Sequence, residues 1–343
     1  MPILSIPKEP FGPAVMTAAP SAATRWRVRL TSATAFRIES LLALAVMTAV
    51  MTVAAWPYFL TVSNALNILL ATSTLGVIAI GMTFVISSAG IDLSVGSLMA
   101  FSGVVGCLAV NNLDAPWPVG ILACVIAGAL AGAVNGSLIA RAAIPAFIVT
   151  LGMLGVARGV ALVLTKGVPV YGLPDPIVYL GQGRPWGIPA PVILLLATAL
   201  IAHVVLIHTR FGLYAQVIGD NEGAARAMGV RVERMKVLIY ALSGGLAGFA
   251  GLIFAARVNA GDPTAGSSYE LTAVTATIVG GTNLFGGRGS ILGTVIGALI
   301  MGVLQNGLNL IGVSSYYQQI AIGAVLVFAV WLNRLNRSEG RRR

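Results

Sequence analysis

Residues 217–236 read VIGDNEGAARAMGVRVERMK and separate two long apolar runs. The stretch holds three acids and four bases, in a chain of 343 residues of which 57% are hydrophobic and only 9% are charged. A soluble domain carries roughly 25% charged residues. The chain is therefore predicted to be an integral membrane protein, and the charged stretch is predicted to be a water-facing interruption between two membrane-spanning segments.

Ten segments are candidates for membrane-spanning helices, since a crossing helix needs about 20 mostly apolar residues. They are residues 41–60, 68–87, 94–110, 118–140, 144–164, 190–207, 237–256, 271–286, 290–311 and 316–332. Glycines break up the eighth segment, which is expected to be a half-helix or a re-entrant segment. These glycines are Gly280, Gly281, Gly286 and Gly287. The predicted fold class is an all-α polytopic membrane protein with about ten transmembrane helices.

The distribution of bases predicts the orientation, because cytoplasmic loops of membrane proteins carry an excess of Lys and Arg. With ten spans and both termini in the cytoplasm, only Lys166, Arg184 and Arg257 lie outside. Arg158 falls within the fifth span, which leaves 17 of the 21 bases inside. Orientation therefore explains the net charge of +10, and no nucleic-acid partner is needed.

Composition divides the chain into three parts. Residues 1–36 are rich in Pro, Ala, Ser and Thr and then basic, and they are expected to form a disordered cytoplasmic arm. Residues 37–333 are expected to form the transmembrane domain. Residues 334–343 are expected to be a basic cytoplasmic tail that contacts anionic lipid and fixes the topology.

With ten spans, the charged stretch lies in the longest cytoplasmic loop, between spans six and seven. The pattern predicts a short helix there. Asp220 or Asn221 can cap its N-terminus, and Gly229 can close its C-terminus. Glu222 and Arg226 form an i,i+4 ion pair along it.

This helix would carry one small apolar face, made of Ala224 and Met228. About nine residues are too few for a stable helix in water, so the helix needs a surface to dock against. One alternative is an interfacial helix lying on lipid headgroups, but such helices bury Trp, Phe or Leu, and this one offers alanines and a single Met. A groove in a partner protein fits the small face better.

The motif GDNEGAARAMGV resembles the coupling helix of permease subunits of ATP-binding-cassette importers, a cytoplasmic helix that sits in a cleft of the ATPase subunit. The family pattern is Glu-Ala-Ala followed by a Gly. Here Gly223 replaces the first alanine, which loosens the helix by roughly 0.5–1 kcal/mol relative to Ala. The resemblance assigns to the coupling helix the residues Asp220, Asn221, Glu222, Gly223, Ala224, Ala225, Arg226, Met228 and Gly229.

Three further stretches resemble the sugar branch of this permease family, which includes ribose, xylose and autoinducer-2 transporters. They are SAGIDLSVGSLMAFSG (88–103), PAFIVTLGMLGVARGVALVLTKGVPV (145–170) and the stretch 262–318, which begins DPTAGSSYELTAV. The resemblance implies a bacterial inner-membrane permease that works with a separate ATPase subunit, a periplasmic sugar-binding protein and a second permease copy or related chain. ATP with magnesium would bind to the ATPase partner, and this chain would bind no cofactor.

Polar residues within the predicted spans are candidates for the sugar pathway or its gate. Asp92, at the start of the third span, is a helix N-cap, a carboxylate near the pathway or a moving hinge, or a group for proton coupling. Arg158 costs about 2.5–3.5 kcal/mol to insert, and it is expected to contact either helix carbonyls or the substrate or gate. Sugars need neutral donors and acceptors, which can equally form helix–helix hydrogen bonds. The neutral candidates are Asn135, Thr150, Tyr269, Gln305, Asn306 and Asn309.

Other function classes find less support in the sequence. No Gly-Lys-Ser/Thr motif occurs, so a Walker-type ATP site is not expected. His203 and His208 have no nucleophile, base or metal cluster spaced around them, which argues against an enzyme or a metal site. Cys107 and Cys124 lie in apolar runs and are expected to be buried thiols. An ion-coupled secondary transporter is the alternative, although intramembrane carboxylates are scarce.

Overall fold

The computed structural model describes residues 39–340, with side chains described as far as Trp331. The predicted arm, residues 1–36, lies outside the described residues. The described chain consists of helices joined by turns and irregular segments, and two short strands, β1 (Val170–Tyr171) and β2 (Ala260–Gly261), pair antiparallel. The helices are Glu39–Ala54, α2 (Val62–Ser87), α3 (Val95–Asn111), α4 (Trp117–Arg141), α5 (Ala146–Thr165), α6 (Asp175–Gln182), η1 (Pro185–Gly187), α7 (Ala190–His208), α8 (Arg210–Asp220), α9 (Glu222–Ala227), α10 (Val232–Val258), α11 (Tyr269–Val279), α12 (Ile291–Leu310) and α13 (Ser315–Gly340).

Each of the ten predicted apolar segments overlaps a helix, but the segments 41–60 and 271–286 extend past the ends of their helices at Ala54 and Val279. Among the described helices, six are long and apolar enough to cross a membrane, namely α2, α4, α5, α7, α10 and α12. The helix Glu39–Ala54, α3, α11 and the apolar part of α13 are shorter. α11 ends at Val279, directly before the glycines that predicted a half-helix or re-entrant segment. The structure therefore shows six candidate spans, and the count of ten crossings stays a prediction.

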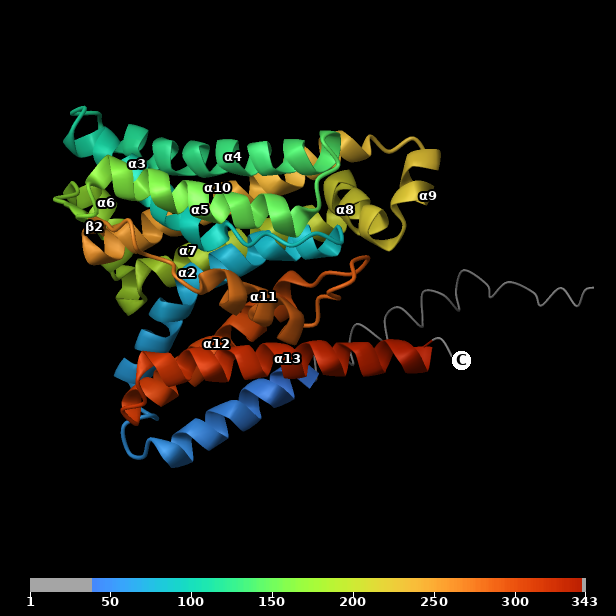
Figure 1. The fold of residues 1–343 in the computed structure, drawn as a ribbon. Coiled ribbons are helices and arrows are strands. Elements are labelled where there is room, and N and C mark those ends of the chain that lie inside the picture. The colour runs from blue at the N-terminus through green and yellow to red at the C-terminus, as the bar shows by residue number, and fades with distance from the viewer. Residues whose placement is uncertain (1–38, 341–343) are drawn as a thin grey trace, which may run out of the picture.

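The bundle has two distinct ends (Figure 1). One end carries α8 and α9 and is called the hairpin end. The opposite end carries the β1–β2 pair and α6 and is called the ribbon end. α10 runs from the hairpin end to the ribbon end, because it begins three residues after Gly229 and ends two residues before β2. Along the chain, α9 is therefore connected to α8 on one side and to α10 on the other.

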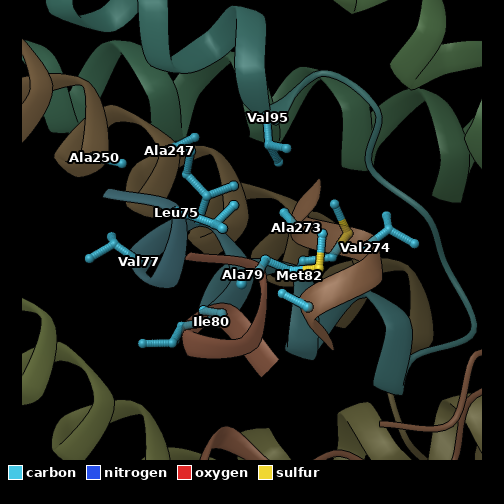
Figure 2. Packing of buried hydrophobic residues seen from close by; sticks show 14 of the residues in the cluster. Leu75, Val77, Ala79, Ile80, Met82, Val95, Ala247, Ala250, Ala273 and Val274 are labelled. Carbon is cyan, nitrogen blue, oxygen red and sulfur yellow. The ribbon is translucent and has the colours of Figure 1, made fainter. Parts of the chain in front are cut away.

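α2 is the central helix. All its residues from Thr72 to Ser87 are buried, and α2 packs against α7, α10, α11 and α12. Figure 2 shows its side chains, among them Leu75 and Met82, between those of α10 and α11. A helix that is apolar on all sides is stable only inside a larger bundle. From Thr72 to Ser87, α2 is therefore shielded from lipid by the rest of the chain, whereas Val62 at its start is 79% exposed.

α4 and α10 approach each other through glycines, because helices in lipid associate by close packing of small residues. A Cβ atom placed on Gly128 would lie 2.1 Å from the carbonyl oxygen of Gly244, and one placed on Gly244 would lie 2.2 Å from the carbonyl oxygen of Gly128. A Cβ on Gly132 would lie 2.1 Å from the carbonyl oxygen of Tyr240. Neither helix has room for a methyl group at this contact.

The α4–α10 contact predicts that Gly132→Ala lowers the thermal stability of the purified protein. Its new methyl group would meet backbone atoms, and overpacking of this kind costs about 1–3 kcal/mol. Gly323→Ala on α13 is the matched control, because nothing lies within 4 Å of a Cβ atom there. The measurement is the unfolding temperature in detergent by size-exclusion chromatography after heating. Equal unfolding temperatures for the two variants would contradict the close approach of α4 and α10.

Candidate functional site

The predicted short helix is present as α9, which spans six residues from Glu222 to Ala227. Asn221 is its N-cap, and the side-chain Oδ1 accepts a hydrogen bond from the Ala224 N–H at 2.9 Å. Gly229 follows the C-cap with a φ of +81°, a left-handed conformation that glycine adopts without a steric penalty. The caps fall where the sequence predicted them, with Asn221 rather than Asp220 at the N-terminus.

Asp220 instead ends α8, a helix that sequence reasoning missed. α8 begins after Thr209, whose hydroxyl accepts a hydrogen bond from the Gly212 N–H at 3.4 Å. Thr209 directly after the last apolar residues of α7 was the available signal, because Thr is a preferred N-cap residue. The charged stretch is therefore part of a helical hairpin, α8–α9, and not a lone helix in a loop.

Three ion pairs join α9 to itself and to the first turns of α10. The predicted pair between Arg226 and Glu222 is present, with Nη2 and Oε1 3.0 Å apart. Glu222 also accepts a hydrogen bond from Lys236 Nζ at 2.7 Å, and Arg226 pairs with Glu233. Half-exposed pairs are each worth little in free energy, but together they fix the position of α9 against α10.

The pKa of Glu222 reflects this network. Partial burial opposes ionisation and is the largest single influence, but hydrogen bonds and charges from Lys236 and Arg226 together outweigh it and hold the pKa below its ordinary value. Glu222 is therefore ionised at neutral pH. Its stabilising contribution is present above the ordinary glutamate pKa and is lost as the pH falls through the lowered value.

The two faces of α9 differ in exposure. Ala225 is fully buried and packs with Ile218, Val232 and Met235 in a small apolar cluster beneath the hairpin. On the opposite side Ala224 is exposed, and Met228 is 68% exposed. α9 therefore presents outward the small apolar face that its sequence predicted, with its inner face already occupied by the chain's own residues.

The hairpin also touches two irregular turns, the α2–α3 turn (88–94) and the α11–α12 turn (280–290). The Gly287 N–H donates to the Ser87 carbonyl oxygen at 3.0 Å. A Cβ atom on Gly219 of α8 would lie 2.0 Å from that same oxygen and 2.8 Å from the Gly287 nitrogen. α8, the end of α2 and the α11–α12 turn therefore meet at one point.

Asp92 lies in the α2–α3 turn and is completely buried. Its Oδ1 accepts hydrogen bonds from the Ser94 N–H at 3.0 Å and the Ser94 hydroxyl at 2.6 Å, and its Oδ2 accepts one from the Ser243 hydroxyl at 3.0 Å. Asn135 Nδ2 donates to the Ser94 hydroxyl at 3.0 Å. Asn135 is six residues from the end of α4 at Arg141, so the cluster lies about 9 Å inside the bundle.

This geometry corrects the N-cap interpretation of Asp92. The N-cap residue of α3 is Ser94, and Asp92 binds the start of α3 from two residues earlier. The carboxylate also joins the turn to α4 and α10, which a cap alone does not do. Ser243 was missed, because nothing in the apolar sequence of α10 distinguishes it from serines that bond only to their own helix.

Two more side chains hold the same turn through the carbonyl oxygen of Ile91. Tyr240 of α10 donates to it at 3.3 Å, and Thr150 of α5 donates to it at 3.4 Å. Along α10, Lys236, Tyr240 and Ser243 recur at intervals of four and three residues and therefore share one face. One face of α10 thus contacts both α9 and the buried α2–α3 turn.

Arg158 lies within α5 and is half-buried. Its Nη1 donates to the carbonyl oxygens of Pro263 and Ala265, at 2.5 Å and 2.8 Å. Both belong to the irregular β2–α11 segment (262–268), so the carbonyls are those of a loop and not of a helix as predicted. Tyr269 begins α11 at the end of that segment.

The remaining predicted pathway residues lie elsewhere. Asn306 Nδ2 donates to Asn64 Oδ1 at 2.9 Å, between α12 and α2. Asn309 Oδ1 accepts a hydrogen bond from Gln318 Nε2 at 2.6 Å, between α12 and α13. Gln305 is half-buried on α12. Asn306 and Asn309 therefore make helix–helix hydrogen bonds, and the structure does not bring the predicted residues into a single site.

The candidate residues described above interact through hydrogen bonds and ion pairs. No group of three or more His, Cys, Asp or Glu side chains between residues 39 and 340 is placed to hold a metal ion. Cys107 and Cys124 are free and buried, as their apolar surroundings predicted.

Comparisons with known proteins assign the family. The family model described as "Branched-chain amino acid transport system / permease component" matches residues 64–330. The chain is 45% identical to the ribose import permease protein RbsC of Escherichia coli K12, over 85% of this chain and 92% of the relative. It is 38% identical to the D-allose transport system permease protein AlsC of the same strain, over 81% of this chain and 85% of the relative.

A third relative is the xylose transport system permease protein XylH of Haemophilus influenzae, 34% identical over 87% of this chain and 96% of the relative. No solved structure matches this chain. The family model spans the candidate membrane-crossing helices and the α8–α9 hairpin together. The protein is therefore a multi-pass membrane protein that belongs to the branched-chain amino acid transport system / permease component family.

Proposed function

We propose that this chain is the membrane-spanning subunit of an ATP-driven importer in a bacterial inner membrane. It passes a monosaccharide, a ribose-like pentose or a related sugar, from a periplasmic binding protein to the cytoplasm. The relatives are named as ribose import, D-allose transport and xylose transport permeases, and these names support the substrate class. The chain moves its substrate without transforming it, and a separate ATPase subunit that holds ATP and magnesium supplies the energy.

The observation that carries this proposal is the α8–α9 hairpin. α9 turns an exposed face of Ala224 and Met228 away from the bundle, while its inner face and its charges are fixed to the protein. A six-residue helix is unstable alone, so its position depends on these contacts and on whatever covers the outer face. An ATPase subunit with a groove for a small helix is the partner that this face fits.

The proposed ATPase subunit also determines the orientation of the chain in the membrane. The ATPase acts in the cytoplasm, so the hairpin end faces the cytoplasm and the ribbon end faces the periplasm. Ten crossings with both termini inside place most of the bases on the cytoplasmic side, in agreement with the positive-inside rule. The short helices α3 and α11 cross with the help of the irregular segments that precede them.

Two routes lead from the hairpin into the bundle. The first runs through α10, where Lys236 contacts α9 and where Tyr240 and Ser243 hold the α2–α3 turn. The second runs through Gly219 to the end of α2 and the α11–α12 turn. Movement of the ATPase subunits displaces the hairpin, and these routes carry the displacement to the helices that open and close the pathway. A second copy of the chain completes the transporter.

The exposed face of α9 predicts that Ala224→Trp abolishes capture of the ATPase subunit. The indole would occupy the space that the partner groove leaves for a methyl group, and overpacking of about 1–3 kcal/mol weakens binding roughly 5- to 150-fold. The measurement is the amount of ATPase that copurifies with the tagged chain from native membranes in mild detergent, together with ATP hydrolysis.

Val53→Trp is the control for this experiment, because Val53 is 81% exposed on the helix Glu39–Ala54, far from α9 in the sequence. It should copurify with as much ATPase as the natural chain does. Undiminished capture by Ala224→Trp would contradict docking through α9. A natural chain that purifies without any ATPase would contradict the importer itself and favour an ion-coupled transporter.

The ion pairs between α9 and α10 predict that Lys236→Met separates hydrolysis from transport. The docking face stays intact, so the ATPase still binds, but the sugar moved per ATP falls by about two- to fivefold, the factor that corresponds to a pair worth up to ~1 kcal/mol. The assay is sugar uptake and ATP hydrolysis by reconstituted vesicles.

Arg234→Met is the matched control, because Arg234 is exposed on the same helix two residues earlier. It should leave the ratio of transport to hydrolysis unchanged. Exchange of the partners, as Glu222→Lys with Lys236→Glu, should recover part of the lost ratio. If Lys236→Met and Arg234→Met lower the ratio of transport to hydrolysis equally, the loss comes from the change in surface charge. The ion pairs between α9 and α10 then do not transmit motion.

A further inference from the structure

The β2–α11 segment (262–268) extends from the ribbon end into the interior of the bundle. It begins beside β2, whose partner β1 receives a hydrogen bond from Asn111 at the end of α3. At the other end of α3, a Cβ atom on Gly96 would lie 2.3 Å from the Gly266 carbonyl oxygen and 2.6 Å from Glu270 Oε2. Gly96 precedes Asn111 by fifteen residues, so Glu270 lies about 22 Å below the ribbon end. The hydrocarbon core of a bilayer is about 30 Å thick.

This segment exposes polar groups at membrane depth. Thr264 and Ser267 are exposed, and Ser268, Glu270 and Arg158 are partly exposed. Glu270 is close enough to Arg158 for their charges to interact. Neither charged side chains nor irregular backbone are stable against lipid at this depth, so such a face must meet water or protein.

Arg158 has hydrogen-bonding capacity left after it has fixed the segment. Both of its bonds to loop carbonyls use Nη1, so Nη2 is left to donate elsewhere. A sugar presents several hydroxyls, each of which donates and accepts. A carboxylate can accept from two such hydroxyls, a guanidinium can donate to them, and serine or threonine hydroxyls can do either. The exposed groups of the segment match this requirement.

We propose that the exposed face of Arg158 and the β2–α11 segment lines the sugar pathway, and that Glu270 and Arg158 hydrogen-bond the passing monosaccharide. The inference rests on the proposed function, because it takes the transported molecule to be a sugar. Arg158 then has two roles: it satisfies the loop carbonyls and it offers a donor to the sugar. Glu270, which directly precedes the eighth predicted segment (271–286), is the accepting group.

Water access tests the position of the face without any need for transport. Both natural cysteines are buried, so Ser267→Cys can be labelled in the otherwise natural chain with a charged, membrane-impermeant methanethiosulfonate. In native membranes the new thiol should react, and its rate should change severalfold when sugar-loaded binding protein and a non-hydrolysable ATP analogue are added. Ile126→Cys is the control, because Ile126 is 51% exposed midway along α4 and should remain unlabelled in lipid.

Two results would overturn the position. Failure of Ser267→Cys to react in every state would mean that lipid or protein covers the face. Formation of a disulfide between two copies of the Ser267→Cys chain would assign the face to a contact between copies. Either result leaves capture of the ATPase by α9 unaffected, so it is distinguishable from failure of the proposed function.

Glu270→Gln tests the contact with sugar. It keeps the shape of the side chain but removes the charge, so the KM for sugar uptake should rise about tenfold, the usual effect of losing a hydrogen bond to a charged group. Copurification of the ATPase and the unfolding temperature should match those of the natural chain. Asp175→Asn, an exposed acid on α6 at the ribbon end, is the control and should leave the KM unchanged. An unchanged KM in Glu270→Gln would show that Glu270 does not bind the sugar.

Discussion

Lipid offers no hydrogen bonds, so each polar backbone group inside the membrane must find its partner within the protein. Two irregular segments of this chain enter the bundle from opposite ends and meet at the start of α3. Asp92, Ser94 and Ser243 satisfy the one that comes from the hairpin end, and Arg158 satisfies the one that comes from the ribbon end. Around this meeting point α4, α5 and α10 pack against α3, while Thr264 and Ser267 of the second segment stay exposed.

The same constraint explains why polar residues in this protein cannot be assigned roles by type. Asp92, Asn135 and Arg158 each help to satisfy irregular backbone that would be unstable in contact with lipid. Asn306 and Asn309 do no more than join helices in the structure. Arg158 both holds a segment and faces outward beside Glu270. A polar residue can therefore be assigned a functional role when its side chain is exposed at membrane depth, and the chemical type of the side chain alone does not decide this.

Much of the fold could be predicted from the sequence, because apolar runs and glycine breaks report directly on helices in lipid. Each of the ten apolar segments overlaps a helix, and the caps of α9 follow from Asn221 and Gly229. The meeting of distant residues could not be predicted in the same way. Asp92 joins Ser243 across 151 positions, and no periodicity links them. The ion pairs of Glu222 and Arg226 to α10 required knowledge of how the hairpin folds back.

The reciprocal glycine contact between α4 and α10 has a mechanical consequence. Each backbone fits into a notch of the other at Gly128 and Gly244, so the two helices can neither slide nor rotate past each other without opening the contact. The two helices therefore move as one rigid unit. α9 contacts this unit through Lys236 near the start of α10, and Asn135, Tyr240 and Ser243 lie farther along it. On α5, in contrast, a Cβ atom added to any of three exposed glycines would meet no atom within 4 Å, so the rest of the chain does not hold this face of α5. These glycines are Gly152, Gly155 and Gly159.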